Sequence, residues 1–434
     1  MTSPVRLGDL IAARGVRRAA VLIAAAVGVA GCSDGDPDPA AAGATTPRSV
    51  VSGPPAGRSV QNGDGSIRPV DAALIEAAWR NDLPAARRLI EQGADVDAPD
   101  DTRQSAFLIA ASEGYLELLE LTLADDADVR SLDSFNGTAL IRAAERGHTT
   151  TVGRLVAAGV AVNHVNNLGW TALHEATLLG DGTERYQDTV RVLLAGGADP
   201  SLAPARDGIA PVEHARIRGL LELQAVIEAA LAGWTDGDPD AALLAAASAG
   251  DANTAMRALR AGAALEARDR RARTPLLLAS AADRRQVARL LVALGADPDA
   301  LDDQHDTPWL VTGVTGSVPM LEILLPARPD LTIRNRFGGV SVIPASERGH
   351  VQYVRRVVQT GIDVNHVNDL GWTALLEAVI LGDGSPRYQQ IVQILLEAGA
   401  DPTIGDHDGV TALEHARRRG QADVASLIAA AGPS

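Results

Sequence analysis

Residues 169–176 read Gly-Trp-Thr-Ala-Leu-His-Glu-Ala, and parts of this pattern return along the chain, as in Thr274-Pro275-Leu276 and Thr411-Ala412-Leu413. Apolar residues equivalent to Leu173 are separated by steps of 33, 33, 33, 39, 31, 33, 33, 33, 33 and 38 residues. They are Leu74, Phe107, Leu140, Leu173, Val212, Leu243, Leu276, Trp309, Val342, Leu375 and Leu413. A unit of this length cannot bury its apolar face alone, so the pattern predicts units that stack and share a continuous core.

Further residues recur with the same period. A turn appears as Gly147-His148 and Gly349-His350, and a closing Gly-Ala-Asp appears at residues 93–95, 197–199, 295–297 and 399–401. Together these residues resemble the ankyrin repeat over about residues 71–431. The resemblance implies an all-α solenoid of about 11 repeats, each a β-hairpin followed by a helix-turn-helix. Thr at the start of the first helix is expected to cap its amides, and Gly to end the helices.

A second periodicity divides the solenoid into two duplicated blocks. Residues 162–170 (Val-Asn-His-Val-Asn-Asn-Leu-Gly-Trp) recur at residues 364–372 with one change, at an offset of 202. The repeats at Val212 and Leu413 lack the closing Gly-Ala-Asp, which is typical of terminal caps. We therefore predict array 1 at residues 71–232 (about five repeats), a junction at 233–239 and array 2 at 240–431 (about six repeats). The step of 31 across the junction leaves one continuous stack open.

The N-terminal segment predicts export. Four arginines precede an apolar run of twelve residues, which suits a signal peptide and is too short to span a bilayer. The run ends in Val29-Ala30-Gly31-Cys32, which resembles the bacterial lipobox. This implies a lipoprotein signal peptide at residues 1–31 and lipidation of Cys32, the only cysteine. A plain secretory signal and an uncleaved anchor are the alternatives, and the export route, Sec or twin-arginine, stays open.

Residues 32–70 are rich in Pro, Gly, Ala, Ser, Thr and Asp, and therefore predict a disordered tether. The expected location is the outer, extracytoplasmic side of the membrane, periplasmic or on the cell surface, with the lipid as the only membrane contact.

Composition argues against several classes of function. The 434 residues carry a net charge of −16, whereas proteins that bind nucleic acids usually present a basic face. A single cysteine excludes an internal disulfide and a cysteine-rich zinc site. The sequence contains no Gly-x-Ser-x-Gly, P-loop, His-Glu-x-x-His or dinucleotide-binding motif. We expect no enzyme activity, no cofactor or metal, and no small-molecule substrate.

The resemblance implies that an unidentified protein partner binds the hairpin tips and the exposed side of the first helix. The two copies of that surface place ten residues there: Asn167, Leu168, Trp170, Leu178 and Leu179, and Asp369, Leu370, Trp372, Ile380 and Leu381. Exposed apolar clusters often mark interfaces, and Trp is enriched at their centres. Alternatively, each Trp packs against the adjacent hairpin. Among the histidines, His164 and His366 recur with this hairpin and are the strongest functional candidates.

The steps of 39 and 38 place an insertion of about five residues between two helices in each block. Both copies keep Gly-Asp-Gly and then Arg-Tyr-Gln, with Asp181, Arg185 and Tyr186 in the first and Asp383, Arg387 and Tyr388 in the second. The favoured interpretation is a longer turn whose Tyr packs against the next helix, with glycines at positive backbone angles. A binding loop, or a hydrolytic or cation-dependent site, are the alternatives.

These patterns predict a non-catalytic protein-interaction scaffold tethered to the membrane. Two linked binding faces would raise avidity for a dimeric or repetitive partner. Two other roles remain open: a dedicated accessory or neutralising partner of an exported enzyme or toxin, and a structural spacer of the cell envelope.

Overall fold

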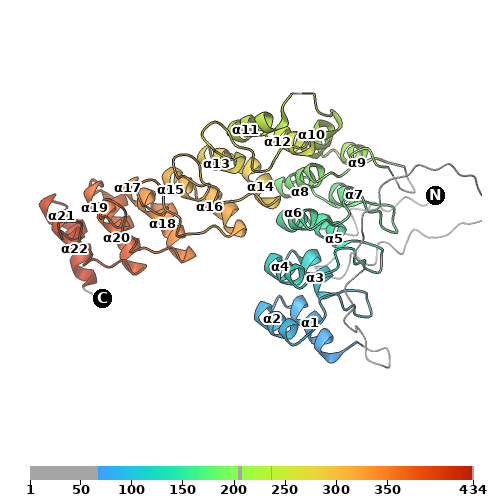
Figure 1. The fold of residues 1–434 in the computed structure, drawn as a ribbon, viewed down its shortest axis with the longest axis horizontal. Coiled ribbons are helices and arrows are strands. Elements are labelled where there is room, and N and C mark those ends of the chain that lie inside the picture. The colour runs from blue at the N-terminus through green and yellow to red at the C-terminus, as the bar shows by residue number, and fades with distance from the viewer. Residues whose placement is uncertain (1–66, 204–207, 236, 433–434) are drawn as a thin grey trace, which may run out of the picture. The chain divides into compact units, whose positions relative to one another are not determined.

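The computed structural model describes residues 67–203, 208–235 and 237–432. The expected signal peptide, Cys32 and nearly all of the expected tether lie outside the described residues. Within them the chain forms 22 α-helices and no β-strand (Figure 1). None of these helices is long and apolar enough to cross a membrane.

The helices alternate between a first and a second helix of each repeat, with odd and even numbers respectively. Their bounds are α1 (Pro69–Trp79), α2 (Leu83–Glu91), α3 (Ala106–Glu113), α4 (Leu116–Ala124), α5 (Ala139–Glu145), α6 (Thr149–Ala157), α7 (Ala172–Leu178), α8 (Glu184–Ala195), α9 (Pro211–Ile217), α10 (Leu221–Leu231), α11 (Pro239–Ala249), α12 (Ala252–Arg260), α13 (Pro275–Ala281), α14 (Arg285–Ala293), α15 (Leu310–Thr315), α16 (Val318–Leu324), α17 (Val342–Glu347), α18 (Val351–Val357), α19 (Ala374–Ile380), α20 (Pro386–Glu397), α21 (Ala412–Arg418) and α22 (Ala422–Ala431). Single 3₁₀ turns extend α16 (η3, Leu325–Ala327) and α18 (η4, Val358–Thr360).

Local sequence sets where the helices begin and end. Five first helices start at a threonine whose hydroxyl accepts a hydrogen bond from the amide three residues ahead, which satisfies one of the free donors of the first turn. These are Thr138, Thr171, Thr274, Thr373 and Thr411. Between the two helices of a repeat, Gly147 and Gly349 have φ values of +68° and +76°, a left-handed conformation that glycine adopts without strain.

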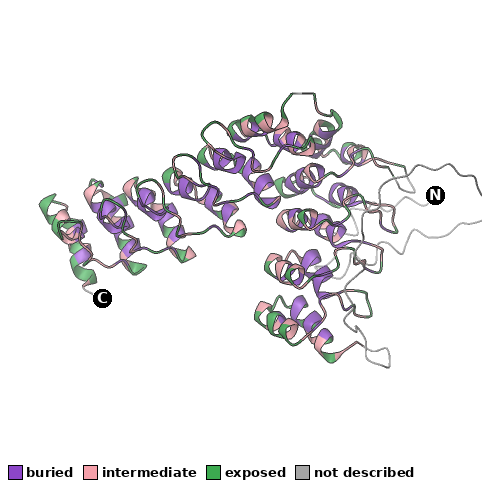
Figure 2. Cartoon of the chain, in the orientation of Figure 1, coloured by how far each residue is buried: buried purple, intermediate pink, exposed green. Residues whose placement is uncertain are grey.

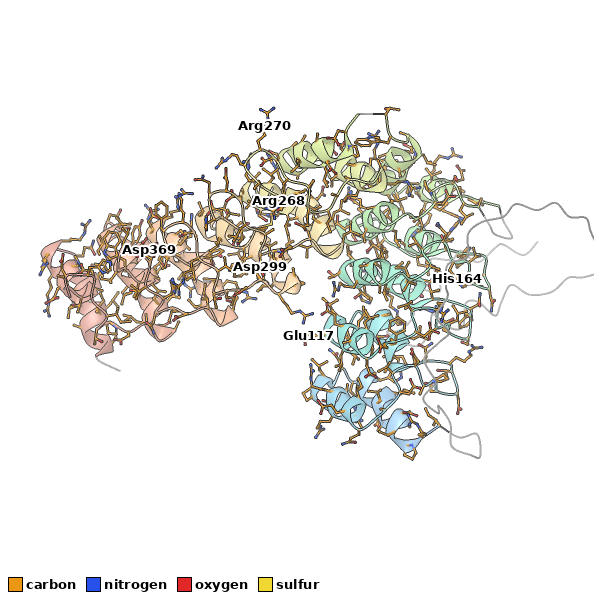
Figure 3. The ribbon with its side chains drawn as sticks, viewed as in Figure 1. Glu117, His164, Arg268, Arg270, Asp299 and Asp369 are labelled. Atoms are coloured by element: carbon orange, nitrogen blue, oxygen red, sulfur yellow. The ribbon has the colours of Figure 1, made fainter. Side chains whose placement is uncertain are left out.

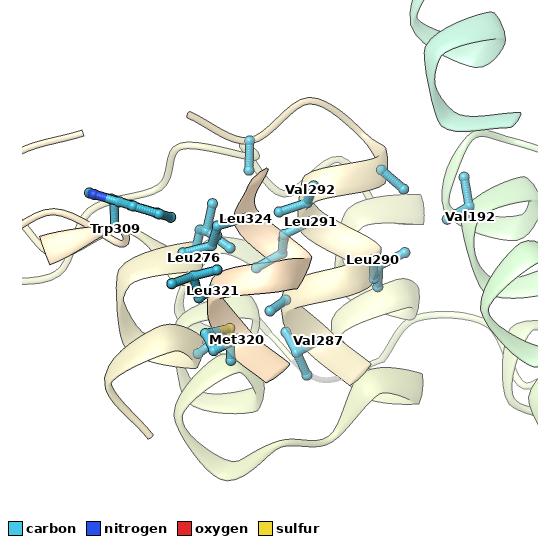
Figure 4. Packing of buried hydrophobic residues seen from close by; sticks show 14 of the residues in the cluster. Val192, Leu276, Val287, Leu290, Leu291, Val292, Trp309, Met320, Leu321 and Leu324 are labelled. Atoms are coloured by element: carbon cyan, nitrogen blue, oxygen red, sulfur yellow. The ribbon is translucent and has the colours of Figure 1, made fainter. Parts of the chain in front are cut away.

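The core lies between the layers of first and second helices (Figure 2). Nine of the eleven periodic apolar residues are buried, and Figure 4 shows Leu276 and Trp309 packed beside Leu321 and Leu324 of α16. The two exceptions, Val212 and Leu413, are only partly buried. They belong to the repeats α9–α10 and α21–α22, on whose first helices no further first helix stacks closely among the described residues.

The connections before the first helices are turns without a strand ladder in the described part of the chain, where only two isolated β-bridges occur. One acidic or amide residue holds each turn, because its side-chain oxygen accepts the amides two and four residues ahead. We call these the tip residues. They are Asp100, Asp133, Asn166, Asp269, Asp302, Asn335, Asn368 and Asp406.

Stacking changes character at the seam between α10 and α11. The second helices stack from α8 through α10 to α12, but α11 does not continue the layer of first helices on α9. Instead α12 packs on α8, and α14 packs on both α6 and α8. The two arrays therefore meet through their second helices. The spacing left open a single stack in which both layers continue, and the structure does not form such a stack.

A close backbone approach and buried charges hold this seam. Gly153 of α6 lies against α14, where an added Cβ would overlap the carbonyl group of Ala293 and lie 3.1 Å from its Cα. On α8 the carboxylate of Asp188, 3% exposed, accepts hydrogen bonds from Arg289 Nε of α14 at 2.6 Å and from Arg191 Nη1 at 3.0 Å. Burial raises the pKa of Asp188, while the two guanidinium groups oppose that rise.

The duplicated block differs at these seam positions. At the offset of 202, Gly153 corresponds to Arg355, Asp188 to Gln390 and Arg191 to Gln393, and all three copies are exposed. The first block buries these three positions against the other array, whereas the second block exposes the equivalent positions to solvent. The difference in residue type therefore follows the difference in burial.

Candidate functional site

The ten predicted partner-binding residues lie on the turns and first helices around α7 and α19. Leu179 and Leu381 are 50% and 48% exposed, and Leu370 is 51% exposed. Asn167 and Asp369 are exposed, whereas Leu168, Leu178 and Ile380 are half-buried. Charged groups project from the same edge of the repeats, and Figure 3 shows Arg270 and Asp369 there.

Both tryptophans of this surface are half-buried. Trp372 packs against the core with part of its ring, and Trp170 occupies the matching position. Each donates its main-chain amide to the tip residue four positions earlier, at 3.0 Å for Trp170 and 2.9 Å for Trp372. Trp372 therefore has a packing role, and both tryptophans keep part of their surface open.

The recurrent histidines tie neighbouring turns together. His164 Nε2 lies 2.7 Å from the carbonyl oxygen of Asn136, and His366 Nε2 lies 2.6 Å from that of Gly338. His407 Nε2 makes the same contact with Asp369 at 3.3 Å. These contacts give His164 and His366 a structural role, and a role in binding stays a prediction.

The inserted segments form longer turns that pack backwards. Tyr186 and Tyr388 lie in the first turns of α8 and α20 and are buried. Their hydroxyls donate to the carbonyl oxygens of Glu145 and Glu347, at 3.0 and 2.8 Å. In both copies the tyrosine thus packs on the preceding repeat, and not on the next helix as the spacing suggested.

The other insertion residues also have structural partners. Asp181 accepts from Thr183, and Asp383 from Ser385, across a two-residue turn. Arg185 and Arg387 are exposed and stack on the neighbouring tyrosine rings. Among the described residues, no group of three or more His, Cys, Asp or Glu side chains is arranged to hold a metal ion.

A feature that the sequence analysis missed links two of the tip residues, Asn166 and Asn368, to the first helix nine residues ahead. Asn166 Nδ2 donates to Glu175 at 2.9 Å, and Asn368 Nδ2 donates to Glu377 at 2.8 Å. The signal was present, because these two tips are Asn where most others are Asp. An aspartate could not donate to a glutamate, so the amide and the acid occur together.

The two buried glutamates have strongly raised pKa values. Burial, followed by the charge of Glu145, raises the pKa of Glu175 to about 7, although Arg142 and Asn166 oppose the rise. Burial, followed by the charge of Glu347, raises the pKa of Glu377 to about 7 as well. Each block thus holds one carboxyl group with a pKa raised to about 7, bonded to the tip residue of the turn before α7 or α19.

Comparisons with known proteins agree with this architecture. A model described as ankyrin repeats in three copies matches residues 107–203 and 313–406, one for many copies matches residues 71–121, and one for a single ankyrin repeat matches residues 272–303. The putative ankyrin repeat protein YahD of Escherichia coli K12 is 41% identical over 190 residues, which are 44% of this chain and 94% of that protein. The chain belongs to the ankyrin-repeat proteins.

Solved ankyrin-repeat structures cover a similar share of the chain. An ankyrin repeat domain from Acinetobacter baumannii is 44% identical, covers 44% of this chain and 98% of its own, and has a TM-score of 0.43. The ankyrin repeat protein EF0377 is 35% identical with a TM-score of 0.42, over 44% of this chain and 97% of its own. The mitochondrial disaggregase of Bos taurus shares 44% identity over 66 residues, which are only 9% of that protein.

Proposed function

We propose that this ankyrin-repeat chain is a non-catalytic scaffold that binds a protein partner through the two copies of its turn-and-first-helix surface. The observation that carries the proposal is the exposure of one apolar position, at the end of α7 and of α19, in both blocks. Leu179 and Leu381 are equivalent residues and are exposed to nearly the same extent. Leu370 and Phe337, on the turns of the second block, extend the apolar surface.

Exposed apolar side chains near polar tips favour a protein partner over a small molecule. Leu179 and Leu381 directly follow α7 and α19, whose first turns are capped by threonine, so binding them orders little of the chain and the entropic cost is low. Because the surface occurs twice, a dimeric or repetitive partner gains avidity without further contacts.

Cross-linking and recovery from intact cells tests this proposal. A variant carrying Leu179→Ser, Leu370→Ser and Leu381→Ser should lose the partner that the native chain recovers. The matched control carries Leu221→Ser and Leu231→Ser on α10, whose side chains are comparably exposed but lie on a second helix. Equal recovery by the native chain and the triple variant would contradict the proposal. Recovery of one exported enzyme or toxin would narrow the role to that of an accessory or neutralising protein.

We also propose that the scaffold is held by a lipid on Cys32 at the outer side of a bacterial membrane. The support is the sequence Val29-Ala30-Gly31-Cys32 after an apolar run of signal-peptide length. Several acyl chains hold a protein firmly on a membrane, whereas one holds it only marginally. Cys32→Ser should therefore move the chain from the membrane fraction to the soluble fraction and abolish labelling with palmitate. A labelled, membrane-bound Cys32→Ser variant would refute the anchor.

A further inference from the structure

The two blocks differ in one cluster on the partner-binding surface. In the first block Arg142 of α5 donates to the tip residue Asp133 and, at 3.0 Å, to Glu145. The guanidinium carbon of Arg142 also lies 5.3 Å from the centre of the Phe135 ring, an arrangement that stabilises a cation. This cluster therefore holds one guanidinium group between a carboxylate pair and an aromatic ring.

In the second block one of the two carboxylates and the ring remain, but the arginine and the tip aspartate are replaced. Glu145 corresponds to Glu347 and Phe135 to Phe337, whereas Arg142 corresponds to Pro344 and Asp133 to Asn335. Among the described residues, no ion pair joins Glu347 or Glu377 to a basic side chain. Phe337 is 53% exposed, and Arg336 of its own turn stacks on the ring.

We propose that the surface formed by Phe337 and Glu347, with Glu377 buried beneath it, receives an arginine side chain of the protein partner, in the place that Arg142 occupies in the first block. This inference rests on the proposed function and names the chemistry of the partner at one point of the surface. In the first block Glu145, the equivalent of Glu347, is bonded to a guanidinium group. The choice of a guanidinium ligand therefore rests on this contact and not on negative charge alone.

The geometry favours arginine over lysine. A planar guanidinium group can bond the Glu347 carboxylate at two points and stack on the Phe337 ring, whereas an ammonium group is a compact charge without a stacking face. Glu377, 5% exposed, lies one helix further and adds negative charge beneath the site. Net charges of opposite sign attract, so a basic segment suits this acidic chain.

Binding should weaken as the pH falls. The charged groups nearby are Arg336, which stacks on the Phe337 ring, the exposed Arg348, Arg387 of α20, which stacks on Tyr388, and His415 of α21, which pairs with Asp406. Since the pKa of Glu377 is raised to about 7, a larger share of this carboxyl group is charged at pH 8 than at pH 6. A cationic ligand prefers the charged form, so its affinity is expected to be lower at pH 6.

The test titrates N-acetyl-argininamide into the full chain at pH 8 and follows the carboxyl-carbon NMR signals of labelled glutamates. The Glu347 and Glu377 signals should shift, and neutral N-acetyl-citrullinamide should leave them unchanged. Glu347→Gln should lower the affinity at least about fivefold, because a charge-assisted bidentate contact is lost. The double variant Asn335→Asp and Pro344→Arg, which rebuilds the filled cluster of the first block, should abolish the shifts while keeping the native melting temperature.

Two results would overturn the inference. One is equal binding of the arginine, lysine and citrulline probes, and the other is unchanged affinity after Glu347→Gln. Because the titration needs no partner, absence of probe binding removes the arginine site alone. The scaffold proposal is tested separately by the cross-linking experiment, and it fails if the leucine substitutions leave recovery of the partner unchanged.

Discussion

Gly153→Ala is expected to separate the two arrays at the seam. In an exposed helix this change normally stabilises by up to about 1 kcal/mol, because alanine is the better helix former. Here the new Cβ would overlap the carbonyl group of Ala293, and that contact is main chain, which cannot rotate away. Ordinary carbon contacts lie near 3.5–4.0 Å, so α6 and α14 must move apart by about 1 Å or more.

The energetic effect follows from what that movement breaks. Overpacking costs about 1–3 kcal/mol, and parting Asp188 from Arg289 leaves a buried carboxylate with fewer partners. We expect a loss of about 2–4 kcal/mol of coupling between the arrays. Each array keeps its own core, so the cooperative transition should divide into two.

Urea unfolding followed by circular dichroism, with limited proteolysis, measures this effect. Gly153→Ala should show a second transition and faster cleavage at residues 233–239. Arg355→Ala is the matched control, because it changes the equivalent, exposed position of the other block and should alter stability by less than about 0.5 kcal/mol. A Gly153→Ala chain that is as stable as the native chain, or more stable, would refute the seam as described.

Three further predictions concern the buried polar groups. The pKa of Glu377 in the folded chain is about 7, above its ordinary value of 4.5, so ionising this buried carboxyl group lowers the stability of the fold as the pH rises between these values. Glu377→Gln should therefore stabilise the chain by up to about 3 kcal/mol at pH 8 and should have no effect below pH 4.5. Urea unfolding at both pH values measures this difference. Asn166→Asp should destabilise the chain by about 2–3 kcal/mol, because it removes the hydrogen-bond donor to Glu175 and places a second negative charge beside it. Adding Glu175→Arg should restore the melting temperature. A double variant that does not recover would count against the pairing. Tyr388→Phe should cost about 1 kcal/mol in thermal unfolding, because the carbonyl oxygen of Glu347 loses its hydroxyl donor; an unchanged melting temperature would contradict that bond.

The helices and most of the core could be read from the sequence because they depend on local periodicity. Thr373 caps α19 as its position before the apolar run predicts, and Leu375 is buried as the 33-residue period predicts. Leu179 and Leu381 follow from the same register, since each comes directly after a first helix, whereas Leu370 lies on a turn. Their role in binding stays a prediction.

The polar interior could not be read in the same way. The pairing of Asn368 with Glu377 joins residues nine apart across a turn and a helix start, a spacing that matches neither the helical nor the strand period. The backward packing of Tyr388 depends on the path of the inserted turn, which composition alone does not determine.

The sequence by itself determined a stack of capped helix pairs, because a 33-residue period of apolar residues can be buried only between neighbours of the same kind. Only the tertiary structure decided that the arrays meet through their second helices. That arrangement depends on the contact of Gly153 with the backbone of Ala293 and on the hydrogen bond between Asp188 and Arg289. Both partners belong to α14 and lie more than 100 residues further along the chain, so the local sequence gives no sign of either contact.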